Sequence, residues 1–170
     1  NAVDDAYDAG IVVVAAAGND GQNDDGDVAS PGTVDTVICV GGVDSDGNIW
    51  EGSSIGDNNG RILPLPVLLP RNDPDRKPEV VAPGDDVPVI MVGDSWGLSS
   101  GTSAATVYVT GAVALMFENN PNLMDGGTDM LDDLKDWIAS TSKMKNGQES
   151  HDKHYAYGLI QFDALIQAAG

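Results

Sequence analysis

The sequence has few basic residues, few aromatic residues and no long apolar run. Only 8 of its 170 residues are Lys or Arg, against 27 Asp and Glu, which gives a formal net charge of −19 at pH 7. A chain this acidic repels phosphate backbones, so we expect no nucleic-acid partner. No stretch approaches the roughly 20 apolar residues that a membrane-spanning helix needs, and we expect no membrane partner either.

Cysteine is nearly absent, with Cys39 the single example. Without a second cysteine the chain cannot form an internal disulfide bond. Cys39 stands in the apolar run Val37-Ile38-Cys39-Val40, where we expect a buried, unreactive thiol rather than a nucleophile. With two Phe and three Trp, the core of one 170-residue domain must consist mainly of aliphatic side chains and alanine.

The excess of acidic residues has two explanations. Adaptation to high salt is one, because molar salt shortens the Debye length to about 3 Å and so removes the self-repulsion of an acidic chain. Calcium binding is the other, since Asp44-Ser45-Asp46-Gly47 resembles the start of a calcium loop. No segment completes the twelve-residue pattern with its closing Glu. We therefore favour salt adaptation and expect a high-salt environment.

The pattern of apolar residues predicts an α/β fold with a mainly parallel sheet flanked by helices. Runs of β-branched residues bounded by glycine are typical of strands that are buried on both faces, as in parallel sheets. The predicted strands cover residues 11–15, 36–40 and 79–82, and the predicted helices cover residues 1–9, 102–117, 128–138 and 163–169. The helix over 102–117 is apolar nearly all round, so we expect it to be buried.

The segment from 61 to 76 differs from its surroundings because it is apolar and punctuated by proline. Proline removes backbone donors, so this segment cannot be a central strand. A surface loop whose leucines fold back onto the body is the favoured interpretation. An exposed apolar strip for a partner is the alternative.

Two motifs of small residues carry the candidate chemistry. Ala15-Ala16-Ala17-Gly18-Asn19-Asp20 follows a predicted buried strand, and Gly101-Thr102-Ser103-Ala104-Ala105 opens a predicted helix. The ends of parallel strands are where sites are built, and a helix start offers free N–H groups to an anion. Ser103 is thus a candidate nucleophile, with its own N–H and the Asn19 side-chain amide as candidate oxyanion donors.

A serine nucleophile also needs a general base, which is normally a histidine held by a carboxylate. His151 and His154 are the two histidines of the chain. Both follow Ser103 in the sequence, and we expect them on the surface and not in the role of the base.

The chain resembles the C-terminal half of the subtilisin-like serine proteases in five blocks that keep the order of that family. The blocks are Gly10–Asn19, Ser30–Gly41, Lys77–Gly84, Gly101–Gly111 and Tyr157–Ile160. The resemblance implies the three-layer subtilisin-like fold, without its N-terminal strands, and peptide-bond hydrolysis by acyl transfer.

Carried over by position, the resemblance gives Ser103 the role of nucleophile and Asn19 that of oxyanion donor. It implies that substrate-binding residues are Ala16, Ala17, Gly18, Ala29 and Thr102, with Ala29 at the pocket floor. Pro31 corresponds to a proline that is often cis in the family. The family also places the catalytic Asp and His before the asparagine motif, in the part of the fold that this chain lacks.

The chain departs from the family pattern at three places. Val107 stands where the family usually has proline, and Ala104 replaces a common methionine. Residues 62–76 look like an inserted loop within the single peptidase domain that we assign to residues 1–170. The family often binds calcium, but here the relevant loop between Gly32 and Val37 offers mainly backbone carbonyls. We therefore assign no metal site and no cofactor, and calcium is the cofactor that the resemblance leaves possible.

We therefore expect the nucleophile-bearing part of a secreted, salt-adapted serine endopeptidase, inactive by itself. Its partners would be a peptide substrate and the missing N-terminal part of the same protein. A pseudo-protease or peptide-binding module that keeps the fold without the chemistry is the alternative. The open edge of the incomplete sheet also predicts association, such as a homo-dimer.

Overall fold

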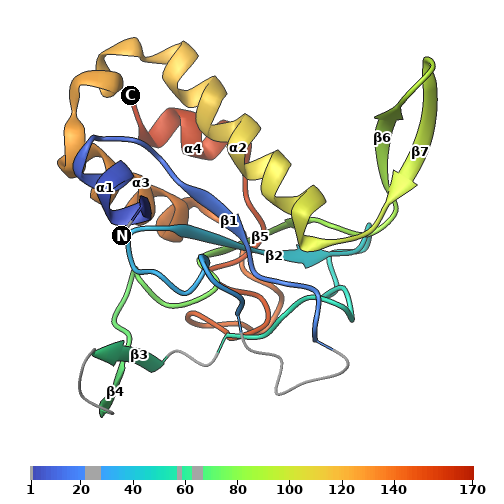
Figure 1. Ribbon diagram of the computed structural model, residues 1–170, viewed down its shortest axis with the longest axis horizontal. Coiled ribbons are helices and arrows are strands. Elements are labelled where there is room, and N and C mark those ends of the chain that lie inside the picture. The colour runs from blue at the N-terminus through green and yellow to red at the C-terminus, as the bar shows by residue number, and fades with distance from the viewer. Residues whose placement is uncertain (1, 22–27, 57–58, 63–66) are drawn as a thin grey trace.

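The computed structural model describes residues 2–21, 28–56, 59–62 and 67–170. Within these ranges its centre is a parallel sheet of three strands, ordered β1 (Val14–Ala16), β2 (Ile38–Val43) and β5 (Val80–Pro83) (Figure 1). In the register, Val14 pairs with Ile38 and Val40 pairs with Val80. The prediction of a parallel sheet is confirmed, although each strand starts one to three residues later than its sequence run.

The start of β1 is displaced because the residues before it are still tied to a helix. α1 (Ala2–Asp8) is followed by a turn at Gly10, whose φ of +73° suits glycine. The Ile11 N–H then donates to the carbonyl of Ala6 at 2.9 Å, which keeps Ile11 out of the sheet.

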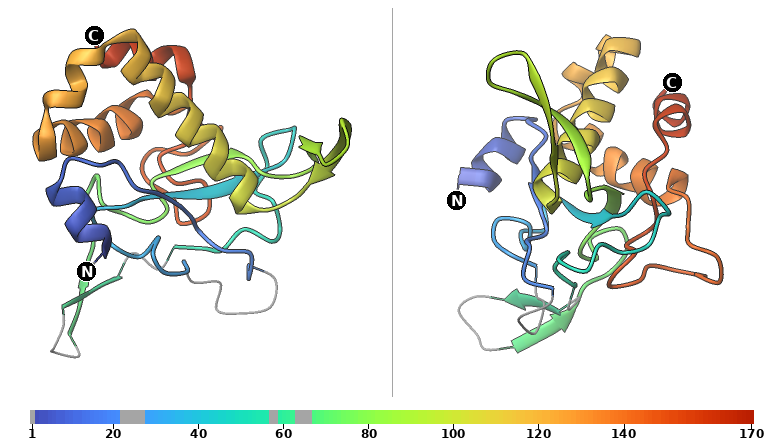
Figure 2. Two further views of the ribbon diagram at one scale, coloured as in Figure 1. Left: turned by 45° about the horizontal axis from the view of Figure 1, so that its top comes forward. Right: turned by 90° about the vertical axis from the view of Figure 1, so that its right-hand side faces the viewer.

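The remaining helices pack together against one face of this sheet (Figure 2). They are α2 (Thr102–Asn119), the short 3₁₀ helix η1 (Pro121–Asp125), α3 (Gly127–Thr141) and α4 (Phe162–Ala168). Alternate strand residues, Ile38, Val40, Val80 and Ala82, join the buried side chains of α2, α3 and α4 in one cluster. The predicted arrangement of a parallel sheet flanked by helices is confirmed.

The opposite face of the sheet is covered by loops and not by these helices. Cys39 packs there with Ala17 and Val28, and Val43 packs with Val81 and Ala156. Cys39 is fully buried, as expected for an unreactive thiol. Burial also raises the pKa of this thiol far above its ordinary value.

The expectation that the helix over 102–117 is buried all round is wrong. Ala105, Val109, Ala112, Val113 and Met116 are buried, but Val107 is 71% exposed and Leu115 is 46% exposed. The reason is geometric: a helix that crosses one sheet presents only one stripe to it, and no element among the described residues covers the opposite stripe. None of the described helices is long and apolar enough to span a membrane.

Two antiparallel hairpins lie outside the central sheet. One pairs β6 (Val87–Met91) with β7 (Ser95–Ser99) and projects away from the body just before α2 (Figure 1). The other pairs β3 (Asn59–Ile62) with β4 (Val67–Pro70). β4 lies within the expected insertion at 62–76, whereas β3 precedes it except for Ile62. This segment is not a central strand, as predicted. Whether its leucines fold back onto the body concerns residues 63–66 and neighbouring side chains, which lie outside the described residues.

Met116 and Leu115 offer a direct test of which stripe of α2 stabilises the fold. The Met116 side chain is fully buried in the core cluster of the helices and the sheet, whereas the side chain of its neighbour Leu115 is half-exposed. We predict that Met116→Ala lowers the free energy of unfolding by about 2–5 kcal/mol, because it removes packed atoms and leaves a cavity. Leu115→Ala should cost less than about 1 kcal/mol. Urea unfolding of both variants checks this, and equal losses would contradict the assigned stripe.

Candidate active site

Backbone hydrogen bonds hold the start of α2 at the carboxyl end of the sheet (Figure 1). The Gly84 N–H donates to the Val43 carbonyl oxygen at 2.8 Å, and the Gly101 N–H donates to the Gly84 carbonyl oxygen at 2.7 Å. A Cβ atom at Gly84 would lie 2.9 Å from the Cα atom of Gly42 and 3.2 Å from the Gly101 oxygen. Only glycine fits there, and this close approach places Ser103 beside the ends of the strands.

The Thr102 side chain joins this helix start to the end of β1. Its hydroxyl oxygen accepts the Gly18 N–H at 3.2 Å and lies 2.9 Å from Asn19 Oδ1 and 3.2 Å from the Gly18 oxygen. The single hydroxyl proton can be donated to either of these two oxygens. Thr102 is fully buried, so its contacts lie within the protein and not on its surface.

The same contacts fix the orientation of the Asn19 side chain. The Thr102 N–H donates to Asn19 Oδ1 at 3.0 Å. A backbone N–H can only donate, so the atom facing it must be the amide oxygen. The Asn19 amide nitrogen, with its two protons, is therefore turned away from Thr102 and is available to an acceptor.

Ser103 is exposed at the first turn of α2. Among the described residues no partner is found for its backbone N–H, which is one of the donors that every helix start leaves without an intrahelical partner. A Cβ atom built on Gly101 would lie 3.5 Å from Asn19 Nδ2 and 3.8 Å from the Ser103 nitrogen. The nitrogens of both candidate oxyanion donors thus lie near one point beside Gly101.

The residues expected to bind substrate fall into two groups. Ala16, Gly18 and Ala29 are at least partly exposed, and a Cβ atom at Gly18 would lie 3.2 Å from that of Ala29. Ala17 and Thr102 are fully buried, and the Ala17 oxygen accepts the Ala29 N–H at 2.7 Å. These two therefore position their neighbours. The Ser30–Pro31 bond is cis, as expected.

Two serines that the sequence reasoning did not single out support the candidate site: Ser54 contacts the loop that carries Asn19, and Ser53 contacts β2. The Ser54 N–H donates to the Gly18 carbonyl oxygen at 3.0 Å, and the Ser54 hydroxyl oxygen accepts the Asp20 N–H at 3.3 Å. The Ser53 hydroxyl accepts the Gly42 N–H at 3.0 Å. The run Gly52-Ser53-Ser54 reads as an ordinary turn, so the sequence offers no signal for this role.

The expectation that both histidines lie on the surface is wrong for His151. It is only 9% exposed, its Nε2 donates to the Pro78 oxygen at 2.8 Å, and its ring meets Tyr157 edge-on. His154 is half-buried, with Nδ1 3.7 Å from Asp152. In the part of the chain that the structure describes, neither ring contacts Ser103, so neither is placed as its general base.

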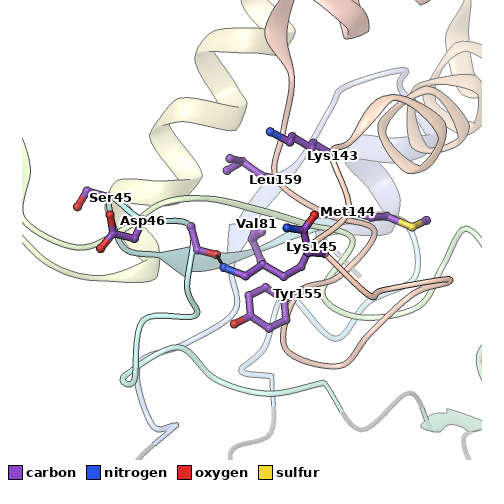
Figure 3. A pocket seen from close by; sticks show the side chains of 11 residues that line it. Ser45, Asp46, Val81, Lys143, Met144, Lys145, Tyr155 and Leu159 are labelled. Atoms are coloured by element: carbon purple, nitrogen blue, oxygen red, sulfur yellow. Dashed lines mark hydrogen bonds between the residues drawn. The ribbon is translucent and has the colours of Figure 1, made fainter.

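A separate cavity of about 310 Å³ lies between the turn after β2 and the segments that precede and follow Tyr155 (Figure 3). Lys145 and Tyr155 lie at its wall, where the ammonium group is 5.6 Å from the ring centre. None of the expected site residues lines this cavity. Among the described residues, no group of three or more His, Cys, Asp or Glu side chains is arranged to hold a metal ion.

Residues 1–158 match the model of the subtilase family. The chain belongs to the subtilase family. Subtilisin DY of Bacillus licheniformis is 34% identical over 167 residues, which are 98% of this chain and 50% of that protein. Serine protease AprX of Bacillus subtilis is 32% identical over 136 residues, which are 72% of this chain and 29% of that protein.

The structure of the prenylagaramide maturation protease PagA is similar in fold. It matches 99% of this chain and 54% of its own length, with a TM-score of 0.73 and 21% sequence identity. The chain thus spans about half the length of subtilisin DY and of PagA. The subtilase resemblance inferred from the five sequence blocks is confirmed at the level of family and fold.

His151 should make stability depend on pH in a defined window. Burial lowers its pKa below the ordinary value, against the opposing effect of the Pro78 hydrogen bond. Between the folded pKa and about 6.5, the unfolded chain then binds more protons, so stability falls as the pH falls. We predict that His151→Gln, which keeps a donor for the Pro78 oxygen, weakens this pH dependence. Urea unfolding between pH 5 and 8 measures the free energy of unfolding as a function of pH. An unchanged slope of this free energy against pH in His151→Gln would show that His151 is not its source.

Proposed function

We propose that this chain is the nucleophile-bearing part of a serine endopeptidase. The observation that carries the proposal is that Asn19 Nδ2 and the Ser103 backbone nitrogen lie 3.5 Å and 3.8 Å from one point beside Gly101, next to the exposed Ser103. Donors fixed in advance around the place where negative charge develops are the main requirement for acyl transfer. Family membership supports the same reaction class.

In the proposed reaction, the Ser103 oxygen attacks a peptide carbonyl carbon while a histidine takes the serine proton. The carbonyl oxygen becomes an oxyanion that accepts hydrogen bonds from the Ser103 N–H and from Asn19. The histidine then gives its proton to the leaving amine, and water hydrolyses the acyl-serine. We propose that this histidine and its aspartate belong to the rest of the peptidase domain, so that the 170-residue chain alone is inactive.

Ala16, Gly18 and Ala29 would form the side of the pocket that this chain contributes. Their small side chains leave the backbone accessible to an extended peptide, while Ala17 and Thr102 position them from beneath. We propose no substrate preference, because small walls admit large and small residues alike.

Two surfaces support the proposal that further polypeptide completes the domain. In the described part of the sheet, β1 pairs only with β2, so its other edge is open to another strand. The hairpin of β6 and β7 exposes Ile90, Val92, Trp96 and Leu98. We propose that the N-terminal part of the protein covers both surfaces, with a second copy of the chain as the substitute when that part is absent.

We further propose an extracellular, high-salt setting. One relative is named the minor extracellular protease Epr, of Bacillus subtilis. The net charge of −19 would destabilise the folded chain by self-repulsion in dilute buffer, and molar salt screens this repulsion.

A peptide-binding module without catalysis is the second candidate. The observation in its favour is that neither histidine among the described residues contacts Ser103. The two candidates differ in whether the serine of the complete protein is activated.

We predict that the complete protein hydrolyses peptides and that a fluorophosphonate probe labels Ser103, with both signals stronger in molar salt. Ser103→Ala should abolish both signals, whereas Ser99→Ala, an exposed serine nearby, should change neither. In subtilisin itself, loss of the oxyanion asparagine lowers kcat by about 100- to 1,000-fold, and we expect Asn19→Leu to fall in that range.

The isolated 170-residue chain should give neither hydrolysis nor labelling. Hydrolysis by the isolated chain that disappears in Ser103→Ala would contradict the proposed origin of the base. A complete protein that binds peptides but leaves Ser103 unlabelled would support the binding module instead.

A further inference from the structure

Three backbone carbonyls in the loop before β2 each accept a hydrogen bond from a basic side chain. Arg71 donates to the Thr33 oxygen at 2.6 Å, Lys135 donates to the Asp35 oxygen, and Lys77 donates to the Val37 oxygen at 2.6 Å. The three carbonyls are two residues apart in the sequence, and their donors come from distant parts of the chain. The loop is thus lined on one side by positive charge.

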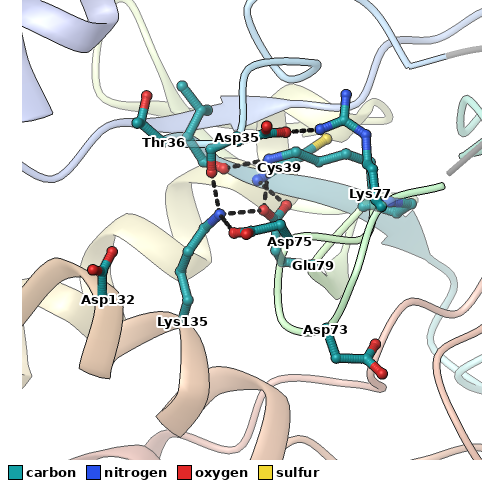
Figure 4. Close-up of polar contacts among 12 residues, drawn as sticks. Asp35, Thr36, Cys39, Asp73, Asp75, Lys77, Glu79, Asp132 and Lys135 are labelled. Atoms are coloured by element: carbon teal, nitrogen blue, oxygen red, sulfur yellow. Dashed lines mark hydrogen bonds and ion pairs between the residues drawn. The ribbon is translucent and has the colours of Figure 1, made fainter. Parts of the chain in front are cut away.

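A buried carboxylate lies against two of these basic side chains, Lys77 and Lys135 (Figure 4). Glu79 is 1% exposed, and its Oε1 lies 2.5 Å from Lys77 Nζ and 3.1 Å from Lys135 Nζ. Its Oε2 accepts the Cys39 N–H at 2.8 Å. The Asp75 carboxylate oxygen Oδ1, in turn, lies 2.6 Å from Lys135 Nζ. The central cluster therefore contains two ammonium groups and two carboxylates.

Burying these groups is unusual for this chain. Lys77 is 1% exposed and Lys135 is 5% exposed, although only 8 basic residues are available to offset 27 acidic ones. An ammonium group is costly to bury unless oxygens surround it. Carbonyl and carboxylate oxygens are also the ligands that calcium and other hard cations take. The oxygens around Lys77 and Lys135 thus have the chemistry of a cation site.

A calcium ion does not fit this loop as the chain stands. The resemblance to subtilases allowed calcium at the carbonyls between Gly32 and Val37. The Asp35 and Val37 oxygens in that loop are already bonded to ammonium groups. A divalent ion there would be repelled by Lys77 and Lys135.

We propose that Lys77 and Lys135 are built-in cations that take the place of a bound metal ion and order the 33–37 loop without one. The loop leads back to Gly32, where a Cβ atom would lie 2.9 Å from Cys39 Sγ and 3.0 Å from the Ala29 oxygen. The 33–37 loop is thus closely packed, through Gly32, against the segment that carries Ala29. This inference does not rest on peptidase activity, because it concerns cation binding and stability.

The charge balance of the cluster sets the test. Lys77→Met removes one positive charge and keeps the carbonyl and carboxylate oxygens, so the vacancy suits a monovalent ion such as K⁺. The double variant Lys77→Met/Lys135→Met removes two positive charges and suits Ca²⁺. Lys145→Met is the matched control, because Lys145 also bonds a carbonyl, that of Gly47 at 2.8 Å, but outside this cluster.

The melting temperature is measured at constant ionic strength in two comparisons. In the first, choline is replaced by K⁺, and in the second, EDTA is replaced by Ca²⁺. Titration calorimetry with the same cations measures their binding to each variant. The melting temperatures of the unaltered protein and of Lys145→Met should rise by the same small amount on adding either cation, because both proteins keep the same acidic surface. Lys77→Met should melt lower without K⁺ and gain from it. The double variant should gain roughly 5–10 °C when Ca²⁺ reaches one hundred times its Kd.

If the double variant fails to fold in EDTA, Ca²⁺ should restore its circular dichroism spectrum. Failure of either cation to stabilise its variant beyond the control would overturn the inference. So would a melting temperature of the unaltered protein that drops on chelation, because the unaltered loop would then depend on a metal ion.

Discussion

The hydroxyl of Thr102 connects the end of β1 to the start of α2, and the geometry of the candidate site depends on this contact. It accepts the Gly18 N–H and faces Asn19 Oδ1, while the Thr102 N–H bonds the same oxygen. Because the Thr102 N–H donates to the oxygen of the Asn19 amide, the amide nitrogen faces away from that N–H. Asn19 Nδ2 and the Ser103 nitrogen lie 3.5 Å and 3.8 Å from one point beside Gly101. A fully buried side chain thus orients an exposed one. The close contact of Gly42 with Gly84 brings the start of α2 near enough to the end of β1 for the Thr102 hydrogen bonds to form.

A second polar cluster holds the other side of the same region. Glu79, Lys77 and Lys135 are buried at the loop before β2, and that loop follows the segment of Ala29. The Ala29 N–H in turn bonds Ala17, two residues before Asn19. Two sets of polar contacts therefore support the side of the proposed substrate pocket that this chain contributes. In a chain of net charge −19, internal ammonium groups give this loop its positive partners whatever the solvent supplies.

The central elements could be predicted from sequence because their signals are local. β-branched runs bounded by glycine gave the parallel strands, and the two small-residue motifs gave Asn19 and Ser103. The other features depend on distant partners. The exposure of Val107 on α2 depends on which elements lie beside the helix, and the burial of His151 depends on the Pro78 carbonyl 73 residues away. Lys77 and Lys135, 58 positions apart in the sequence, both contact Glu79.

The most direct test of the account is the kcat of the complete protein carrying Thr102→Val, which removes the hydroxyl and keeps the shape of the side chain. Because Asn19 would lose part of its support, we predict that kcat falls at least about tenfold with little change in KM. Thr102→Ser, which restores the hydroxyl, should restore most of the kcat. A Thr102→Val protein with unchanged kcat would contradict the claim that Thr102 orients the oxyanion donor.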